Sequence, residues 1–249
     1  MKSLKQLLVL IFILFISCKQ EYHQVDINVL NITKNGDSIE NGLWIYDTGK
    51  FGVISRGNFL NGMLEGKWTY KLGKDSIKTI WNIYKVDSIK FSFPDKYELI
   101  DTSKLDYPLI FQAKIIKDDK NTHFSILKHK LEDADYAAYE YLLLDKEEIM
   151  EDPNTEVLSM NARKYIFKNI DIFKLVVDMK QKEEYKFISY IFIVGNYLYD
   201  FVYKNQASEV SNIEFQIFDE ILYSIECNGI DLFTYNTRHY LDEEEIILK

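Results

Sequence analysis

The sequence predicts an α+β protein: a glycine-rich ribbon of β-hairpins, followed by an antiparallel sheet covered by helices. Three observations predict it. Eight of the ten glycines lie between Gly36 and Gly73, whereas all three prolines come later. A Trp-x-Tyr pattern recurs within the glycine-rich part, and strand-like runs with an apolar helical stripe fill the rest. With 249 residues, 47% of them apolar, the chain is long enough to bury a core.

The first 18 residues have the layout of a secretion signal. Lys2 and Lys5 supply positive charge, and residues 7–16 form a run of ten apolar side chains. A transmembrane helix needs about 20 such residues. This run is therefore too short to span a bilayer and has the length of the apolar part of a signal peptide.

The segment Leu14-Phe15-Ile16-Ser17-Cys18 resembles the lipobox of bacterial lipoproteins. The resemblance implies diacylglycerol on the Cys18 sulfur, with fatty acyl chains such as palmitate that hold the protein to a membrane. The alternative is a plain signal peptide with an incidental cysteine. Lys19 follows the cysteine, and Lys19-Gln20-Glu21 is partly similar to the surface-export tag of Bacteroidota. We therefore expect the protein to lie in the cell envelope, anchored to the outer membrane and facing either the periplasm or the cell exterior.

The glycine-rich segment repeats itself. Gly42-Leu43-Trp44-Ile45-Tyr46 recurs 24 residues later as Gly66-Lys67-Trp68-Thr69-Tyr70, and residues 81–84 keep the aromatic pair alone. Trp and Tyr two positions apart point to one face of a strand. Between the copies, Asn61-Gly62 suits the tight turn of a hairpin.

These residues resemble the MORN-type repeat, in the variant of YwqK-like proteins. The match consists of Gly57, Phe59, Gly62, Gly66, Trp68 and Tyr70. The resemblance implies a ribbon of hairpins that serves as a spacer or a contact surface. The aromatic side chains are then either the packed face of the ribbon or an exposed strip that binds a partner.

The second region alternates strand and helix patterns. Strand-like runs cover residues 89–93, 110–116, 123–131, 172–180, 185–194 and 197–204, and a helical pattern runs from Ala134 to about Met150. An apolar stripe from Val210 to Ile225 predicts a closing helix, and Ser211 with Glu214 predicts its capping box. Strands with helices before and after them indicate an antiparallel sheet covered by helices.

The order of three short motifs resembles PsbP-like and DcrB-like domains. The motifs are Phe93-Pro94-Asp95-Lys96-Tyr97, residues 195–199 and residues 218–225. The resemblance implies an αβα sandwich around an antiparallel sheet, without a common catalytic site. We therefore expect a signal peptide and lipidation site at 1–18, a tether at 19–27, MORN-like repeats at 28–88, a PsbP/DcrB-like domain at 89–228 and a tail at 229–249.

The sequence contains no motif of an enzyme active site: no phosphate loop, nucleophile elbow, dinucleotide fingerprint or zincin helix. His123 and His129 lie on one predicted strand, too far apart to share a metal ion. Cys227 follows an apolar pattern, and we interpret it as a buried thiol. The net charge of −9 argues against nucleic-acid binding. We predict no catalytic residue, no metal and no cofactor.

We therefore expect a membrane-anchored, non-catalytic protein-interaction module with a protein partner, such as an immunity or assembly factor. The alternative is an envelope lipoprotein that binds a small molecule or a lipid in a pocket between sheet and helix. Two aromatic faces are candidates for the interaction surface, and each has the alternative of being buried core. They comprise Trp44, Tyr46, Trp68, Tyr70, Tyr197, Tyr199 and Tyr203.

Overall fold

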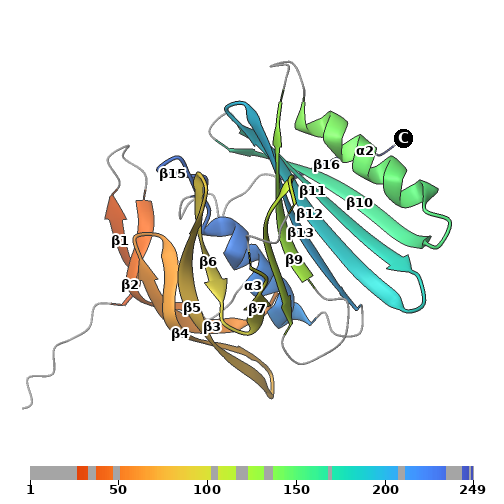
Figure 1. The fold of residues 1–249 in the computed structure, drawn as a ribbon. Helices are drawn as coiled ribbons and strands as arrows, with labels where there is room; N and C mark the ends of the chain where they lie inside the picture. Colours follow the sequence, from red (N-terminus) through yellow and green to blue (C-terminus); the bar gives the residue numbers. More distant parts are fainter. Residues whose placement is uncertain are drawn as a thin grey trace, which may run out of the picture.

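The computed structural model of this protein contains two antiparallel β-sheets that pack around one helix (Figure 1). Helix α3 (Asn212–Tyr223) lies between the sheets, and helix α2 (Ala138–Glu151) covers the far face of the second sheet. The structure describes residues 27–32, 38–46, 51–101, 106–115, 123–131, 137–167, 170–206, 211–233, 243–246 and 248. None of the helices in this part of the chain combines the length and apolar character that crossing a bilayer requires. The architecture belongs to the expected α+β class.

The first sheet, called sheet 1, has the strand order β1-β2-β3-β4-β5-β6-β14-β15. Its strands are β1 (Val29–Ile32), β2 (Ser38–Tyr46), β3 (Ile54–Leu60), β4 (Met63–Leu72), β5 (Asp75–Val86), β6 (Ile89–Pro94), β14 (Glu226–Cys227) and β15 (Ile230–Asp231). From β1 to β6, strands that follow each other in the chain also pair, so this part is a meander. The chain then returns to add β14 beside β6.

The second sheet, called sheet 2, has the strand order β16-β10-β11-β12-β13-β9-β8-β7. Its strands are β16 (Glu243–Ile246), β10 (Glu156–Phe167), β11 (Ile170–Lys180), β12 (Glu184–Val194), β13 (Tyr197–Gln206), β9 (His123–Lys130), β8 (Leu109–Ile115) and β7 (Tyr97–Leu99). We call the face toward sheet 1 and α3 its inner face, and the face toward α2 its outer face. Strand β10 is absent from the sequence-based expectation. Its mixed polar composition lacks a clean period of two, and a bulge between Val157 and Ser159 shifts its register.

Two glycines show why the glycine-rich pattern forms hairpins. Asn61 and Gly62 adopt φ values of 50° and 80°, the left-handed conformation that a two-residue hairpin turn requires. Gly57 serves a different purpose, because the ring of Trp68 packs directly on its backbone. A Cβ at position 57 would lie 2.1 Å from that ring. The predicted turn at Asn61-Gly62 is confirmed.

Most of the predicted aromatic interaction surface is buried core. Tyr46 and Tyr197 are partly exposed. The other five candidates are at most 3% exposed: Trp44, Trp68, Tyr70, Tyr199 and Tyr203. The alternation along each strand turns these rings toward the opposite sheet and α3, where they join one cluster. An exposed aromatic strip is therefore wrong for these five, and the alternative interpretation, a packed face, holds.

The domain boundary expected at Ser88 does not divide the structure. Ser88 lies in the turn between β5 and β6, which are neighbours in sheet 1, with Val86 opposite Ile89. Phe91 of β6 then contacts Phe111 of sheet 2, with ring centroids 5.1 Å apart. Segments 28–88 and 89–228 thus share a core, so the hairpin ribbon is not a separate spacer. The expected tail from 229 supplies β15 and β16 to the two sheets.

Helix α3 is buried on two sides. This accounts for its apolar stripe and for the burial of some of its polar residues. Ser211 caps it by accepting a hydrogen bond from the Glu214 N–H at 3.3 Å. The Glu214 carboxylate does not complete the predicted capping box, because it binds the Lys96 ammonium at 2.5 Å instead. Two further carboxylates of the helix, Asp219 and Glu220, are buried against opposite sheets. A sheet lies on either side of α3, so even its polar residues are enclosed.

Candidate functional site

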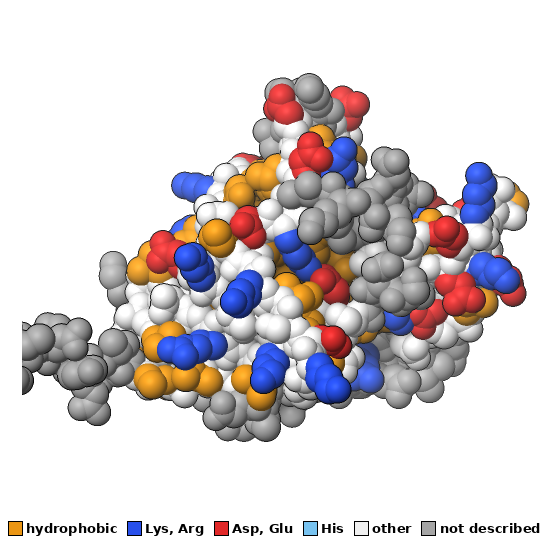
Figure 2. All heavy atoms as spheres, turned by 90° about the horizontal axis from the view of Figure 1, so that it is seen from below, with side chains coloured by type: hydrophobic (Ala, Val, Ile, Leu, Met, Phe, Trp, Pro, Cys, Tyr) orange, Lys and Arg blue, Asp and Glu red, His pale blue; other side chains and the backbone are white. Residues whose placement is uncertain are grey.

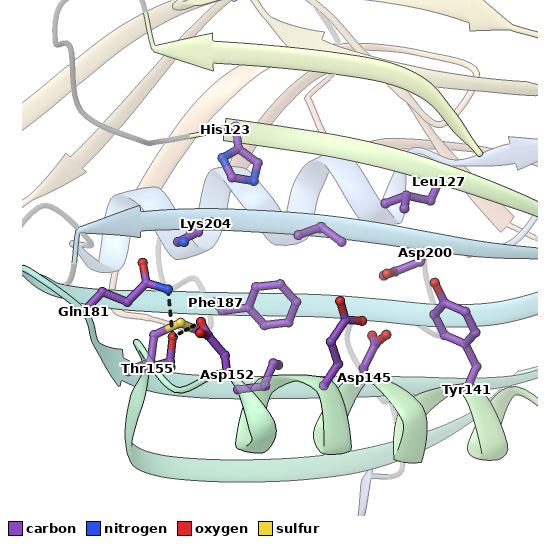
Figure 3. A pocket seen from close by; sticks show the side chains of 14 residues that line it. His123, Leu127, Tyr141, Asp145, Asp152, Thr155, Gln181, Phe187, Asp200 and Lys204 are labelled. Atoms are coloured by element: carbon purple, nitrogen blue, oxygen red, sulfur yellow. Dashed lines mark hydrogen bonds between the residues drawn. The ribbon is translucent and has the colours of Figure 1, made fainter. Parts of the chain in front are cut away.

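A cavity of about 460 Å³ lies between α2 and the outer face of sheet 2 (Figure 3). It is lined by α2, by four strands of sheet 2 and by the turn that follows α2. The lining residues are His123, Leu127, Tyr141, Asp145, Glu148, Ile149, Asp152, Thr155, Met179, Gln181, Phe187, Asp200, Val202 and Lys204. This mixture of apolar and charged side chains is typical of a ligand site rather than of a packed interface.

The helix contributes one polar face. Tyr141, Asp145, Glu148 and Asp152 follow one another at intervals of four, three and four residues, which places them on one side of α2. Asp152 is the C-cap, with extended backbone, because the next residue is Pro153 and a residue before proline disfavours the helical conformation. The helix end thereby fixes Asp152 at one end of the cavity.

Strand β13 contributes the floor through simple alternation. Its odd-numbered aromatic residues face the inner core, and its even-numbered residues Asp200, Val202 and Lys204 face α2. In the neighbouring strand β9, Leu127 lies opposite Asp200 and His123 lies opposite Lys204. Directly opposite residues share a face, so all five line the same cavity.

Asp145 and Asp200 form a carboxyl pair at one end of the cavity, beside Tyr141 (Figure 3). Asp200 is 3% exposed, and the Ser189 hydroxyl donates a hydrogen bond to its Oδ1 at 2.5 Å. Within the described residues, this is the one hydrogen bond to the Asp200 carboxylate. The Oδ2 of Asp145 is buried and has no hydrogen-bond partner in the same part of the chain. Two acids thus face the cavity with unused acceptor capacity.

Burial changes the acidity of both groups. Burial raises the pKa of Asp200 to about 7. The pKa of Asp145 is raised to about 8 by burial, and then by the charges of Asp200 and Glu148. Because like charges in a low-dielectric site oppose each other's ionisation, the pair titrates as a unit and retains a proton near neutral pH.

The opposite end of the cavity behaves differently. The Thr155 hydroxyl donates to Asp152 at 2.5 Å, and the Asn154 N–H donates to it at 2.9 Å. These hydrogen bonds hold the pKa of Asp152 below its usual range. The Gln181 amide donates to the Thr155 hydroxyl at 2.8 Å and completes this end (Figure 3). Asp152 therefore keeps its negative charge at neutral pH.

Basic groups around the cavity are few, and two of them, Lys204 and His129, have lowered pKa values. The pKa of Lys204 is lowered by burial, although the charge of Asp152 opposes the shift, and its ammonium lies 4.9 Å from the ring centroid of Tyr185. His129 contacts the Tyr141 hydroxyl through Nε2 at 2.9 Å, and burial lowers its pKa, so it is neutral at pH 7. Four carboxyl groups therefore outnumber the basic groups of the lining, Lys204 and His123.

The chemistry of this cavity favours an organic cation over a metal ion. Within the described residues, no group of three or more His, Cys, Asp and Glu side chains is placed to hold a metal. The lining between the two acidic ends is apolar: Phe187 lies in the middle of the cavity (Figure 3), and Val202 lies between Asp200 and Lys204 on β13. An ammonium group beside the carboxyl pair, with an aliphatic part on this floor, satisfies both features.

Sequence reasoning missed the carboxyl pair. One signal was available: Asp200 interrupts the run Tyr197-Leu198-Tyr199-Asp200-Phe201-Val202-Tyr203, where a charge needs a reason. Of the predicted sites, Cys18 lies outside the described residues. Cys227 is fully buried, and burial raises the pKa of its thiol, which confirms the expected buried cysteine.

A second cavity, of about 610 Å³, lies at the start of α2, where Tyr139, Phe173 and Ile246 are among its lining residues. Its charged side chains, Lys164 and Asp171, pair with each other at 2.7 Å. Because these charges are already matched, this cavity lacks the unused polar groups of the first one.

Comparisons with known proteins yield likenesses of fold only. No protein-family profile matches the sequence, and no curated protein matches it significantly. Among solved structures, cyanobacterial PsbP (CyanoP) from Synechocystis is similar, with a TM-score of 0.46 and 11% identity over 63% of this chain and 97% of that chain.

Two further structures are more distant. A protein from Bacteroides thetaiotaomicron has a TM-score of 0.35 and 13% identity, covering 56% of this chain and 45% of its own. A Pseudomonas aeruginosa protein of unknown function has a TM-score of 0.29 and 9% identity, covering 52% and 85%. A PsbP structure is thus among the neighbours, but likenesses at these levels carry no argument about function.

Proposed function

We propose that this protein is a lipid-anchored, non-catalytic binding module of the bacterial cell envelope that takes a small organic cation in the cavity under α2. The observation that supports this proposal is the carboxyl pair of Asp145 and Asp200 at the cavity: Asp200 is buried with one hydrogen-bond donor, and half-buried Asp145 has a buried oxygen without a donor among the described residues. A buried acid without a hydrogen-bond donor destabilises the fold, and acids with strongly raised pKa values cluster at functional sites.

The anchor is the part of the proposal that comes from the sequence. The lipobox-like segment ending at Cys18 would place acyl chains in the membrane, at the outer membrane by the reasoning from Lys19. The MORN-like and PsbP/DcrB-like assignments of segments 28–88 and 89–228 belong to the same proposal. In this view the αβα arrangement around sheet 2 supplies the cavity, and the hairpin meander completes the core.

The ligand site can be tested by thermal unfolding of the full chain with three probe cations: n-butylammonium, putrescine and choline. A ligand that binds the native state alone stabilises it by about 2.7 kcal/mol at 100 times its Kd. We expect a rise in Tm with at least one cation at pH 8, and none with n-butanol, which has the same aliphatic chain as n-butylammonium without its charge.

Two variants sharpen this test. Asp200→Asn removes a charge from the carboxyl pair and should abolish the rise in Tm. Asp171→Asn, in the second cavity, removes the same charge elsewhere and should leave the rise unchanged. No shift with any cation, or an equal shift with n-butanol, would contradict the proposed site.

Protein interaction is the second candidate function, and one observation favours it. Strand β1 ends sheet 1 in the described part of the chain, and its Leu30 and Ile32 are 40% and 68% exposed. Exposed apolar residues on an edge strand suit the addition of a partner strand. A pull-down with the lipidated chain tests this idea: Ile32→Lys should lose the partner, whereas Leu158→Lys, at a similarly exposed apolar position, should keep it.

A further inference from the structure

One surface of sheet 1 has the opposite charge to the protein as a whole. Residues 51–86 contain six Lys and Arg against two Asp and Glu, in a chain whose net charge is −9. The inner side of β3 and β4 is buried aromatic core, so their charged side chains lie on the outer side. Figure 2 shows Lys and Arg gathered on the underside of the molecule, with hydrophobic side chains between them.

Four of these cations form a single patch across three strands. Arg56 of β3 lies opposite Thr69 of β4, which lies opposite Lys78 of β5. On either side of this row, Lys71 lies opposite Ile54, and Lys67 lies opposite Ile80. We call this patch the basic face: Arg56, Lys67, Lys71 and Lys78, with Ile54 and Ile80.

The cations of the basic face are not paired with acids within the described residues. Its four cations form no ion pair or hydrogen bond there, whereas Lys96 binds Glu214 and Lys128 binds Asp87 elsewhere in the fold. Its apolar members, Ile54 and Ile80, are 43% and 42% exposed. One acid, Glu65, is exposed on the same side of β4, two residues before Lys67, so the four cations are only partly offset. Clustered cations repel one another, and an excess of them on one surface favours an anionic partner.

The position of the basic face in the chain suggests what kind of anionic partner it meets. Strand β1, the first described strand, belongs to the same sheet, and eight residues separate Cys18 from Ile27. Eight residues span at most about 30 Å when fully extended. If Cys18 carries the anchor, sheet 1 holds the first described strand after the membrane. This step rests on the anchor of the proposed function.

We propose that the basic face docks on anionic phospholipid headgroups of the membrane that holds the anchor. Lysine and arginine stems with interspersed isoleucines are the side chains that enter the headgroup layer, their charged ends meeting phosphate. Docking in this way places α2 on the side away from the bilayer, because α2 covers the face of sheet 2 that is turned from sheet 1 (Figure 1). The cavity is then open to the aqueous phase.

Energy transfer in nanodiscs tests this orientation with the full, lipidated chain. A donor dye is placed on the outer side of β3 through Asn58→Cys or, in a second protein, on α2 through Glu147→Cys; both positions are exposed. The buried Cys227 and an acylated Cys18 leave the introduced thiol to react. The acceptor is a dye on lipid headgroups, in discs of phosphatidylcholine alone or mixed with phosphatidylglycerol.

We expect strong transfer from position 58 in phosphatidylglycerol discs, weaker transfer in phosphatidylcholine discs, and low transfer from position 147 in both. Raising the salt concentration should reduce the difference, because headgroup attraction is screened. Lys67→Glu with Lys78→Glu should lower the ratio of docked to undocked protein at least about 25-fold, from about fivefold for each lysine lost.

Lys180→Glu with Lys182→Glu provides the matched control, because it changes the net charge equally at exposed positions elsewhere: the end of β11 and the turn that follows it. Equal loss of energy transfer in both double variants would mean that the net charge of the protein, and not the basic face, controls docking. This result would overturn the proposal. Transfer that does not depend on phosphatidylglycerol would also overturn it, and would leave an acidic protein as the partner of the basic face. A chain that elutes apart from the discs refutes the anchor itself, whereas a chain that stays with them without this transfer refutes the docking alone.

Discussion

Helices α2 and α3 lie on opposite faces of sheet 2, and both bring carboxylates toward it. Under α3, the Tyr70 hydroxyl donates to Glu220 at 2.5 Å and the Tyr190 hydroxyl donates to Asp219 at 2.9 Å. Under α2, Asp145 has a buried oxygen without a partner among the described residues. Asp219 keeps one oxygen, Oδ2, buried and without a partner among the same residues. The two helices therefore differ in their donors: each acid of α3 accepts from a tyrosine hydroxyl, whereas Asp145 accepts no hydrogen bond within the described residues and lines a cavity.

Under the proposed function, this difference separates acids that support the fold from acids that bind a ligand. A buried carboxylate with a hydroxyl donor recovers much of its lost hydration, and its removal harms the fold. A carboxylate that faces a cavity without a donor does not recover the free energy of hydration that it lost on burial until a ligand binds. The inner face of sheet 2 is thus a core with acids built into it, and the site that we propose on the outer face lies beside a core.

The largest effect is expected where α3 joins the two sheets. Phe218 is 2% exposed and lies 5.0 Å from Tyr203 and 6.0 Å from Phe124 between ring centroids. Phe218→Ala should lower the free energy of unfolding by about 3–5 kcal/mol, measured by urea denaturation. Leu144→Ala, at a half-exposed position of α2, should change it by less than about 0.5 kcal/mol. A small effect at Phe218 would mean that α3 is not an essential part of the core.

The next largest effect concerns the satisfied acids. Tyr70→Phe removes the hydroxyl that donates to Glu220 and leaves a buried carboxylate short of one hydrogen bond. We expect a loss of about 1–3 kcal/mol in the free energy of unfolding. Tyr84→Phe removes a hydroxyl that makes no hydrogen bond within the described residues, and it should be nearly neutral. Equal losses for the two variants would argue against a structural role for the Tyr70 hydroxyl.

A third prediction concerns the open acids and their ligand. Protonation of the carboxyl pair removes the charge that attracts an ammonium group, so affinity should fall as the pH decreases below the raised pKa of Asp200, about 7. If one ionised carboxylate is required, lowering the pH from 6.5 to 5.5 weakens binding roughly tenfold. Calorimetric titration of n-butylammonium, which stays protonated over this range, measures the change. A pH-independent affinity would place the ligand away from the pair.

The sequence predicts the individual helices and strands better than the tertiary contacts between them. The stripe of α3 follows from its helical period, and the outward position of Asp200 follows from the alternation of β13. What no local pattern reveals is that α3 has a sheet on both sides, or that Asp145 meets Asp200 across a cavity, because both depend on tertiary packing. The boundary expected at Ser88 failed for the same reason: the turn there is a local feature, whereas the pairing of β6 with β14 is not.

The smallest effect, and the most direct test of the comparison, is the stability of Asp200→Asn across pH. The pKa of Asp200 in the folded protein is raised from 3.8 to about 7, so the native state holds its proton more tightly than the unfolded chain does. The resulting stabilisation is complete below the unfolded value and is lost as the pH rises through the folded one. Asparagine cannot ionise, so the variant should gain stability relative to the wild type as the pH rises from 5 to 8, by an amount on the order of 1 kcal/mol.

Urea denaturation at several pH values measures this gain, with Asp171→Asn as the control at a half-exposed, ion-paired position. The control should run parallel to the wild type. If Asp200→Asn also runs parallel, the Asp200 carboxylate is as well accommodated as Glu220 is on α3. The outer face of sheet 2 would then be one more packed core, and the cavity would lose its reason to attract a cation.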